Sequence, residues 1–149
     1  MLVMTARSLQ SAERLCRDKG LTFTQLRKQV YKLVAAQASP VSAYELLDEL
    51  KIRRRNAAPV TVYRALDFLL HAGLVHRIDA LHAYAACEAA SADHGGMLLV
   101  CDGCRNITEF ENAGLEQQIA RTALDHQFHT ARRLIEIRGL CGDCSANRE

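Results

Sequence analysis

The sequence predicts an α+β protein: an N-terminal part of helices that ends in a β-hairpin, followed by a small C-terminal α/β part. Three observations support this prediction. Apolar residues recur at helical spacing in the first half, short extended apolar runs are typical of the second, and the charge differs between the halves. Residues 1–83 contain 13 Lys/Arg and 7 Asp/Glu, whereas residues 84–149 contain 6 and 10, so the formal net charge of +2 conceals balances of +6 and −4. The basic half is therefore a candidate for binding a polyanion.

The composition is that of an ordinary globular protein. Of the 149 residues, 49% are hydrophobic and 24% are charged, which excludes general disorder. The chain contains no apolar run long enough for a membrane-spanning helix, and its polar start does not resemble a secretory signal. These features predict a cytoplasmic protein with no membrane association.

Four segments of the basic half have the apolar periodicity of helices. The first lies within residues 5–18 and is the weakest. The second begins at Thr22–Gln25 and the third at Ser42–Glu45, both of which have the spacing of a capping box. The fourth and strongest pattern covers residues 60–72 and ends at Gly73. We expect all four to pack their apolar faces into one core.

Two short extended runs follow, Leu74–Ile78 and Leu81–Ala85, and predict a β-hairpin. Helices followed by a hairpin is the order of a winged helix-turn-helix, in which residues 60–72 would form the recognition helix. Because the apolar face of that helix is used for packing, its polar residues must point outwards, and they are Tyr63, Arg64, Asp67 and His71. An outward Arg can reach guanine, and an outward Tyr can contact a phosphate or a thymine methyl group.

Further basic residues are candidates for phosphate contacts, namely Arg27, Lys28, Arg53, Arg54 and Arg55. Each of them taken singly could equally be an ordinary solvated charge. Taken together on the winged-helix pattern, they favour DNA binding.

The acidic half contains two CxxC pairs, Cys101-Asp-Gly-Cys104 and Cys141-Gly-Asp-Cys144, separated by 36 residues. Each follows an extended apolar run, at Met97–Val100 and Leu134–Arg138, so each is expected in a turn at a strand end. Four thiolates suit a structural zinc ion. A cytosolic address disfavours disulfides, and neither pair has the βαβ context of a redox motif, whereas an iron–sulfur cluster stays chemically possible.

Four other residues form a second candidate set: His76, Cys87, His94 and Glu109. Four such ligands would coordinate Zn²⁺ tetrahedrally, and the two anionic ones would neutralise its formal charge. Each residue alone has an ordinary interpretation, such as a solvated His or a buried Cys. The weaker candidates are His71, His82, His126, His129 and Asp93, and we interpret Cys16 as a core residue.

The C-terminal part is too small to bury much core of its own. A structural metal and symmetric dimerisation, through the sheet and a helix near Leu115–Leu124, would compensate for this deficit.

The sequence resembles the ferric-uptake-regulator family of metal-dependent bacterial repressors, most closely its zinc-uptake regulator subgroup. The resemblance spans about residues 21–144 and rests on the two CxxC pairs and four motifs: Leu21–Arg27, Ser42–Leu47, Pro59–Leu69 and Gly73–His76. It implies a winged-helix DNA-binding domain at residues 1–83, a hinge at 84–90 and a zinc-binding dimerisation domain at 91–149. It also implies a homodimer that binds AT-rich palindromic operators in double-stranded DNA.

Residue by residue, the resemblance implies two zinc ions per protomer. The structural ion would be bound by Cys101, Cys104, Cys141 and Cys144, and the regulatory ion by His76, Cys87, His94 and Glu109. DNA contacts would come from Tyr44, Tyr63 and Arg64. Iron sensors of the family usually carry a His-His-Asp-His run before the first CxxC pair, whereas this chain has Ala92-Asp-His94-Gly-Gly. That departure and the Cys at position 87 favour zinc, and the same departure puts a third metal site in doubt.

The sequence therefore predicts a zinc-responsive repressor of zinc-uptake genes, with zinc at the hinge locking a dimer for operator binding. An iron- or peroxide-sensing regulator of the same family is the alternative. A zinc hydrolase or deaminase is disfavoured, because no H-x-E motif accompanies a P-C-x-x-C motif and four ligands leave no open position on the metal. We expect no enzymatic activity.

Overall fold

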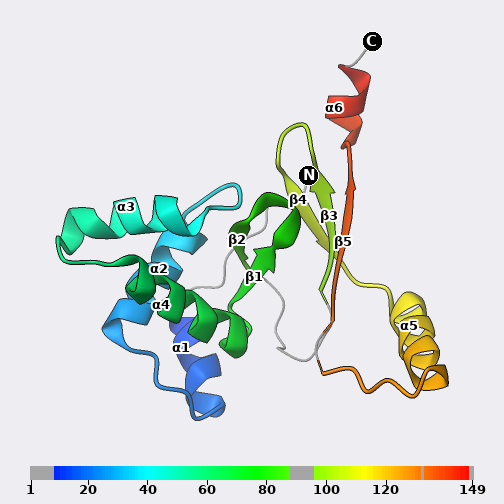
Figure 1. Cartoon of the computed structure of the whole chain (residues 1–149), viewed down its shortest axis with the longest axis horizontal. Helices are drawn as coiled ribbons and strands as arrows, with labels where there is room; N and C mark the ends of the chain where they lie inside the picture. The colour runs from blue at the N-terminus through cyan, green and yellow to red at the C-terminus, as the bar shows by residue number, and fades with distance from the viewer. Residues whose placement is uncertain (1–8, 88–95, 132, 148–149) are drawn as a thin grey trace. The chain divides into compact units, whose positions relative to one another are not determined.

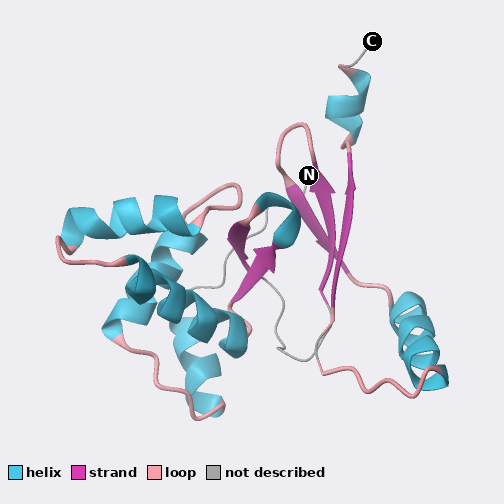
Figure 2. Ribbon diagram, in the orientation of Figure 1, coloured by secondary structure: helices cyan, strands magenta, loops and turns pink. Residues whose placement is uncertain are grey.

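The computed structural model describes residues 9–87, 96–131 and 133–147, and the chain divides into two units, Met1–Ala92 and Asp93–Glu149. The elements of both units are shown in Figure 1 and coloured by type in Figure 2.

The first unit consists of helices followed by a hairpin. Its helices are α1 (Leu9–Asp18), α2 (Gln25–Ala35), α3 (Ala43–Arg53) and α4 (Pro59–Ala72). Strands β1 (Val75–Ile78) and β2 (Ala83–Ala86) pair antiparallel and are joined by a short 3₁₀ turn, η1 (Asp79–Leu81). A single bridge from Val41 to Tyr84 adds the segment before α3 to this sheet. The order of elements is that of the predicted winged helix-turn-helix.

Two helix starts illustrate how local sequence determines these elements. At α3 the predicted capping box is confirmed: the Ser42 N–H donates to Glu45 Oε2 at 2.7 Å, and the Glu45 N–H donates to Ser42 Oγ at 3.2 Å. At α2 the predicted box at Thr22–Gln25 is wrong, because Thr24 is the N-cap and accepts from the Arg27 N–H. The Thr22 carbonyl instead accepts from the Arg27 guanidinium, and Gln25 is the first helical residue.

The core of the first unit lies between α2, α3 and α4, with α1 packed against it. Cys16 is 1% exposed within this core, which agrees with its interpretation as a packing residue. On α4 the face expected to be apolar consists of Val62, Ala65, Leu66, Leu69 and Leu70. All but the half-buried Leu70 are buried, and Ala72 is buried as well. The helix ends at Gly73, whose φ of 76° is left-handed and therefore suits glycine.

The hairpin extends further along the chain than expected. Residues 84–86, the start of the hinge that the resemblance implies, belong to β2, and the Cys87 N–H donates to the Leu74 carbonyl at 2.9 Å. The remainder of the expected hinge, residues 88–90, lies outside the described residues.

The second unit has a three-stranded sheet with β3 in the middle. Its elements are β3 (Gly96–Cys101), β4 (Ile107–Phe110), α5 (Ala113–Asp125), β5 (Leu134–Gly139) and α6 (Gly142–Ala146). Strand β3 pairs antiparallel with β4 and parallel with β5, and α5 provides the crossover connection that parallel pairing requires. Figure 2 shows α5 near the end of the sheet where β4 ends and β5 begins, and none of its residues is buried. No helix within the described residues is long and apolar enough to cross a membrane.

Candidate metal centres and nucleic-acid interface

The two CxxC pairs come together at one end of the second unit. Cys101 ends β3 and Cys141 is the N-cap of α6, and the parallel register places Cys101 opposite Gly139, two residues before Cys141. The four sulfur atoms all lie within 4.8 Å of one another, and Cys104 Sγ is 3.8 Å from Cys141 Sγ. All six cysteines of the chain are free thiols. A tetrahedral Zn–S site with bonds of about 2.3 Å has sulfurs about 3.8 Å apart, so the four sulfurs of this cluster fit zinc.

Hydrogen bonds make the four thiols unequal. Backbone N–H groups, first that of Cys104 and then that of Cys141, lower the pKa of Cys101 to about 6. The neighbouring sulfurs, first that of Cys141, raise the pKa of Cys144 to about 12. At neutral pH the cluster therefore contains thiolate and thiol together. A divalent metal would have to displace protons from the remaining thiols, as zinc does in structural sites.

The second candidate set is divided between the two units. His76 lies on β1 and Cys87 directly follows β2, and their ligand atoms lie within 4.8 Å of each other. Cys87 is buried, with 3% of its surface exposed. Glu109 lies on β4 of the second unit, and His94 falls outside the described residues. Within a single unit, the structure therefore brings together two of the four predicted ligands.

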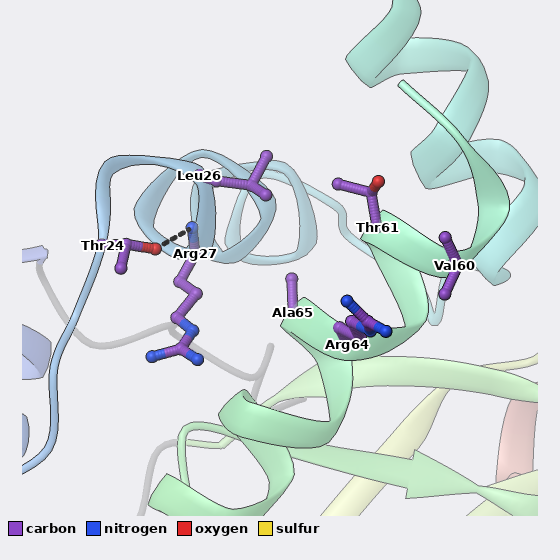
Figure 3. Close-up of a pocket in the computed structure, with 7 residues that line it drawn as sticks. All are labelled: Thr24, Leu26, Arg27, Val60, Thr61, Arg64 and Ala65. Carbon is purple, nitrogen blue, oxygen red and sulfur yellow. Dashed lines mark hydrogen bonds between the residues drawn. The ribbon is translucent and has the colours of Figure 1, made fainter. Parts of the chain in front are cut away.

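The residues predicted to contact DNA are on the surface of α3 and α4. Tyr44 is 71% exposed and Tyr63 is 43% exposed, and Arg64 is exposed beside Tyr63. Arg64 and Arg27 both line a hollow of about 280 Å³ at the start of α2 and α4, which Figure 3 shows together with Thr24 and Thr61.

A second hollow, of about 420 Å³, shares two lining residues with the first and adds further cations. The residues that line it are Leu26, Arg54, Arg55, Asn56, Ala57 and Thr61. No acidic residue is among those that line either hollow. The surface next to the start of α4 is therefore cationic and suits a phosphate backbone.

Several cations proposed from the sequence also have partners within the protein. The Arg27 guanidinium lies 3.9 Å from the centre of the Phe68 ring, and Arg54 Nε donates to Gln29 Oε1 at 2.8 Å. Lys28 forms an ion pair with Glu13 at 2.6 Å. Sequence spacing did not reveal these contacts, because each joins different elements. They hold Arg27 against α4 and Arg54 against α2.

Comparison with known proteins places this arrangement among known regulators. Residues 18–138 match the ferric uptake regulator family. The chain is 35% identical over 141 residues to the zinc uptake regulation protein of Escherichia coli, covering 94% of this chain and 82% of that protein. It is 34% identical over 131 residues to the zinc uptake regulation protein of Mycobacterium tuberculosis, covering 84% and 95%.

Two solved structures have a closely similar fold. A zinc uptake regulator complexed with zinc and DNA superimposes with a TM-score of 0.85 at 34% identity, covering 93% of each chain. Holo XcZur superimposes with a TM-score of 0.83 at 39% identity, covering 93% of this chain and 96% of that one. The predicted α+β fold class is confirmed by both.

Proposed function

Because the chain belongs to the ferric uptake regulator family, which consists of transcription regulators and not enzymes, we propose that it is a zinc-responsive repressor of zinc-uptake genes that acts in the cytoplasm. The observation that carries the choice of metal is the His76–Cys87 pair of the first unit. A thiolate and an imidazole suit zinc, whereas the iron and manganese sites of hard-metal sensors prefer oxygen ligands.

Two zinc ions per protomer are proposed. The structural ion would be held by the four cysteines of the second unit, whose grouping supports a closed site. The regulatory ion would be held by His76 and Cys87 of the first unit together with His94 and Glu109, for which the support is the match to the family motif and the donor chemistry. Zinc would supply a link between ligands from both units.

The regulatory step follows from where these ligands lie in the sequence. His76 and Cys87 belong to the hairpin that follows the recognition helix α4, so fixing them fixes the orientation of α4. In a dimer, two recognition helices must lie about 34 Å apart to enter successive major grooves. If zinc bound the arrangement with this spacing about 10⁴-fold more tightly than the other arrangements, its binding would switch the protein almost completely into the DNA-binding state.

We further propose that the protein is a homodimer on an AT-rich palindromic operator, read by Tyr44, Tyr63 and Arg64. The homodimer is supported by apolar side chains that stay exposed in the second unit, among them Leu124 and Phe128, each 63% exposed, and Ile137, 46% exposed. A second copy of the chain that covered these side chains would remove their apolar surface from water.

The decisive experiment is Cys87→Ser, with Cys16→Ala as the matched control for loss of a buried thiol. The probe is a DNA sequence selected from a random pool by the zinc-loaded wild-type protein, and binding is followed by fluorescence anisotropy during a zinc titration. Cys87→Ser should keep the dimer and one zinc per chain but lose zinc-dependent binding, while Cys16→Ala keeps both. Zinc-dependent binding by Cys87→Ser would exclude Cys87 as a regulatory ligand.

The role of Arg64 is tested with the same DNA. Arg64→Ala should weaken binding to the selected sequence by about 1–3 kcal/mol and binding to unrelated DNA much less, because a guanine contact carries specificity. Arg14→Ala, on the exposed face of α1, is the control and should change neither. Equal losses on both DNAs would make Arg64 a phosphate contact.

The metal content of the protein distinguishes a zinc-responsive repressor from the alternative, an iron- or peroxide-sensing regulator. Protein purified without added metal should contain zinc, and iron in excess should not replace it. Iron in the purified protein, with iron-dependent DNA binding, would favour the alternative.

A further inference from the structure

The two CxxC turns have the same length but reversed middle residues: Cys101-Asp102-Gly103-Cys104 and Cys141-Gly142-Asp143-Cys144. The structure uses the two acids differently. Asp102 Oδ1 accepts from Arg138 Nε at 3.0 Å and from Arg138 Nη2 at 2.8 Å, whereas Asp143 lies in the first turn of α6.

Asp102 is tied to β5 twice. Besides the ion pair with Arg138, its backbone N–H donates to the Gly139 carbonyl at 2.8 Å. Both partners lie on β5, within three residues of Cys141 and 36 or more residues from Asp102 in sequence. The contacts of Asp102 therefore fix the first CxxC turn directly against the strand that leads into the second.

The glycines of the two CxxC turns, Gly103 and Gly142, also differ in how closely their neighbours approach them. A Cβ atom at Gly103 would lie 2.9 Å from Cys144 Sγ and 3.0 Å from Cys144 Cβ, so Cys144 packs against the bare backbone of the first turn. A Cβ atom at Gly142 would meet nothing within 4 Å. The second turn therefore packs against the first through Cys144 and Gly103.

We propose that Asp102 and Arg138 are positioning residues of the four-cysteine site, which hold the two CxxC turns in register so that the four sulfurs bind zinc as a preorganised set. This inference rests on the zinc site of the proposed function. Outer partners that orient ligands in this way typically contribute 10- to 100-fold to metal affinity. Because the side chains of Arg138 and Asp102 are 58% and 42% exposed, we expect an effect at or below the lower end of that range.

A purely electrostatic role makes a different prediction from a positioning role. Four thiolates and Zn²⁺ carry a formal charge of −2, so the cation of Arg138 would stabilise the loaded site and the anion of Asp102 would destabilise it. On charge alone, Asp102→Asn should slow zinc release. If the pair positions the turns, both Asp102→Asn and Arg138→Met should accelerate release.

The experiment measures zinc transfer from the full-length protein to an excess of a chromogenic pyridylazo-resorcinol chelator. All variants carry Cys87→Ser, so that only the four-cysteine site is observed. We expect Asp102→Asn and Arg138→Met each to release zinc about 3- to 10-fold faster than the reference, and the double variant to release it no faster than either single one. Arg138→Lys should restore most of the slow rate, and Asp143→Asn is the control that should match the reference.

Salt gives a second readout that a merely structural role would not move. At about 1 M NaCl an exposed ion pair is screened, so the reference should approach the rate of the variants. The inference is overturned if Asp102→Asn releases zinc at the reference rate or more slowly, if the two substitutions are additive, or if Asp143→Asn is equally fast. A reference protein that contains no zinc would instead refute the zinc site of the proposed function.

Discussion

The two units of this chain achieve their folds by different means. In the described residues, 23 of the 28 buried apolar side chains belong to the first unit, whose helices surround a continuous core. The second unit buries five, four of them on the central strand β3, and α5 contributes none. The apolar core of the first unit can account for its stability, whereas the second unit needs a further source. The four-cysteine cluster and the exposed apolar surface of α5 and β5 are the two available sources.

Zinc removal should produce the largest difference in stability between the two units. We expect a strong chelator to abolish the fold of the second unit and to leave the first unit folded, because structural zinc sites contribute about 10–16 kcal/mol in small domains. Hydrogen exchange measured by mass spectrometry on the full chain checks this. Peptides of β3 and β5 should lose protection while those of α2 and α4 keep it.

The reciprocal control is Leu66→Ala, because Leu66 is 0% exposed in the core of the first unit. This substitution should lower the free energy of unfolding of the first unit by about 2–5 kcal/mol and leave the zinc content unchanged. Loss of protection throughout the chain after chelation would show that the two units are not independent in stability.

Adding one methyl group at each CxxC glycine should distinguish the two turns of the second unit. Gly103→Ala places a Cβ atom against Cys144, and such overpacking typically costs about 1–3 kcal/mol. Gly142→Ala faces open space and lies in α6, so it should be neutral or stabilise slightly. Urea unfolding of the zinc-loaded proteins measures both. If Gly142→Ala were as unstable as Gly103→Ala, the contact between Gly103 and Cys144 would not explain the loss of stability.

The sequence predicted the helices well because their signals are local. The Ser42–Glu45 box, the apolar face of α4 and the stop at Gly73 each lie within one or two turns of chain. The error at α2 has the same origin. Thr22 and Thr24 both precede the helix, and the spacing rule matched Thr22 with Gln25, whereas the backbone makes Thr24 the cap. The spacing rule alone does not decide between two neighbouring threonines.

The four-cysteine cluster could be predicted because the strand ends that hold it can be recognised in the sequence. Each CxxC pair follows an apolar run, so their grouping in the second unit was expected, and the structure brings the four sulfurs together. The Asp102–Arg138 pair was not foreseen, because the parallel pairing of β3 with β5 that brings them together spans 36 residues. The regulatory set stays a prediction. The hairpin brings His76 close to Cys87, but Glu109 belongs to the second unit and His94 lies outside the described residues.

The smallest expected effect is a loss of stability of the first unit at alkaline pH. Burial raises the pKa of the Cys16 thiol above its ordinary value, although Lys19, Arg27 and Lys28 nearby act to lower it. A pKa that is raised in the folded state gives stability that is present below the pKa of the unfolded thiol and is lost as the pH rises above it. Between about pH 8 and pH 10, wild type should therefore lose more free energy of unfolding than Cys16→Ala.

Urea titrations at the two pH values measure this difference. Burial also raises the pKa of Tyr84, but that contribution is present in both proteins and cancels in the comparison. Contributions from the cysteines of the second unit cancel in the same way. Cys16→Ala should be less stable than wild type at pH 8, because it leaves a cavity, and the gap should narrow as the pH rises. A gap that stays constant would mean that the Cys16 thiol ionises as readily in the folded protein as in the unfolded chain.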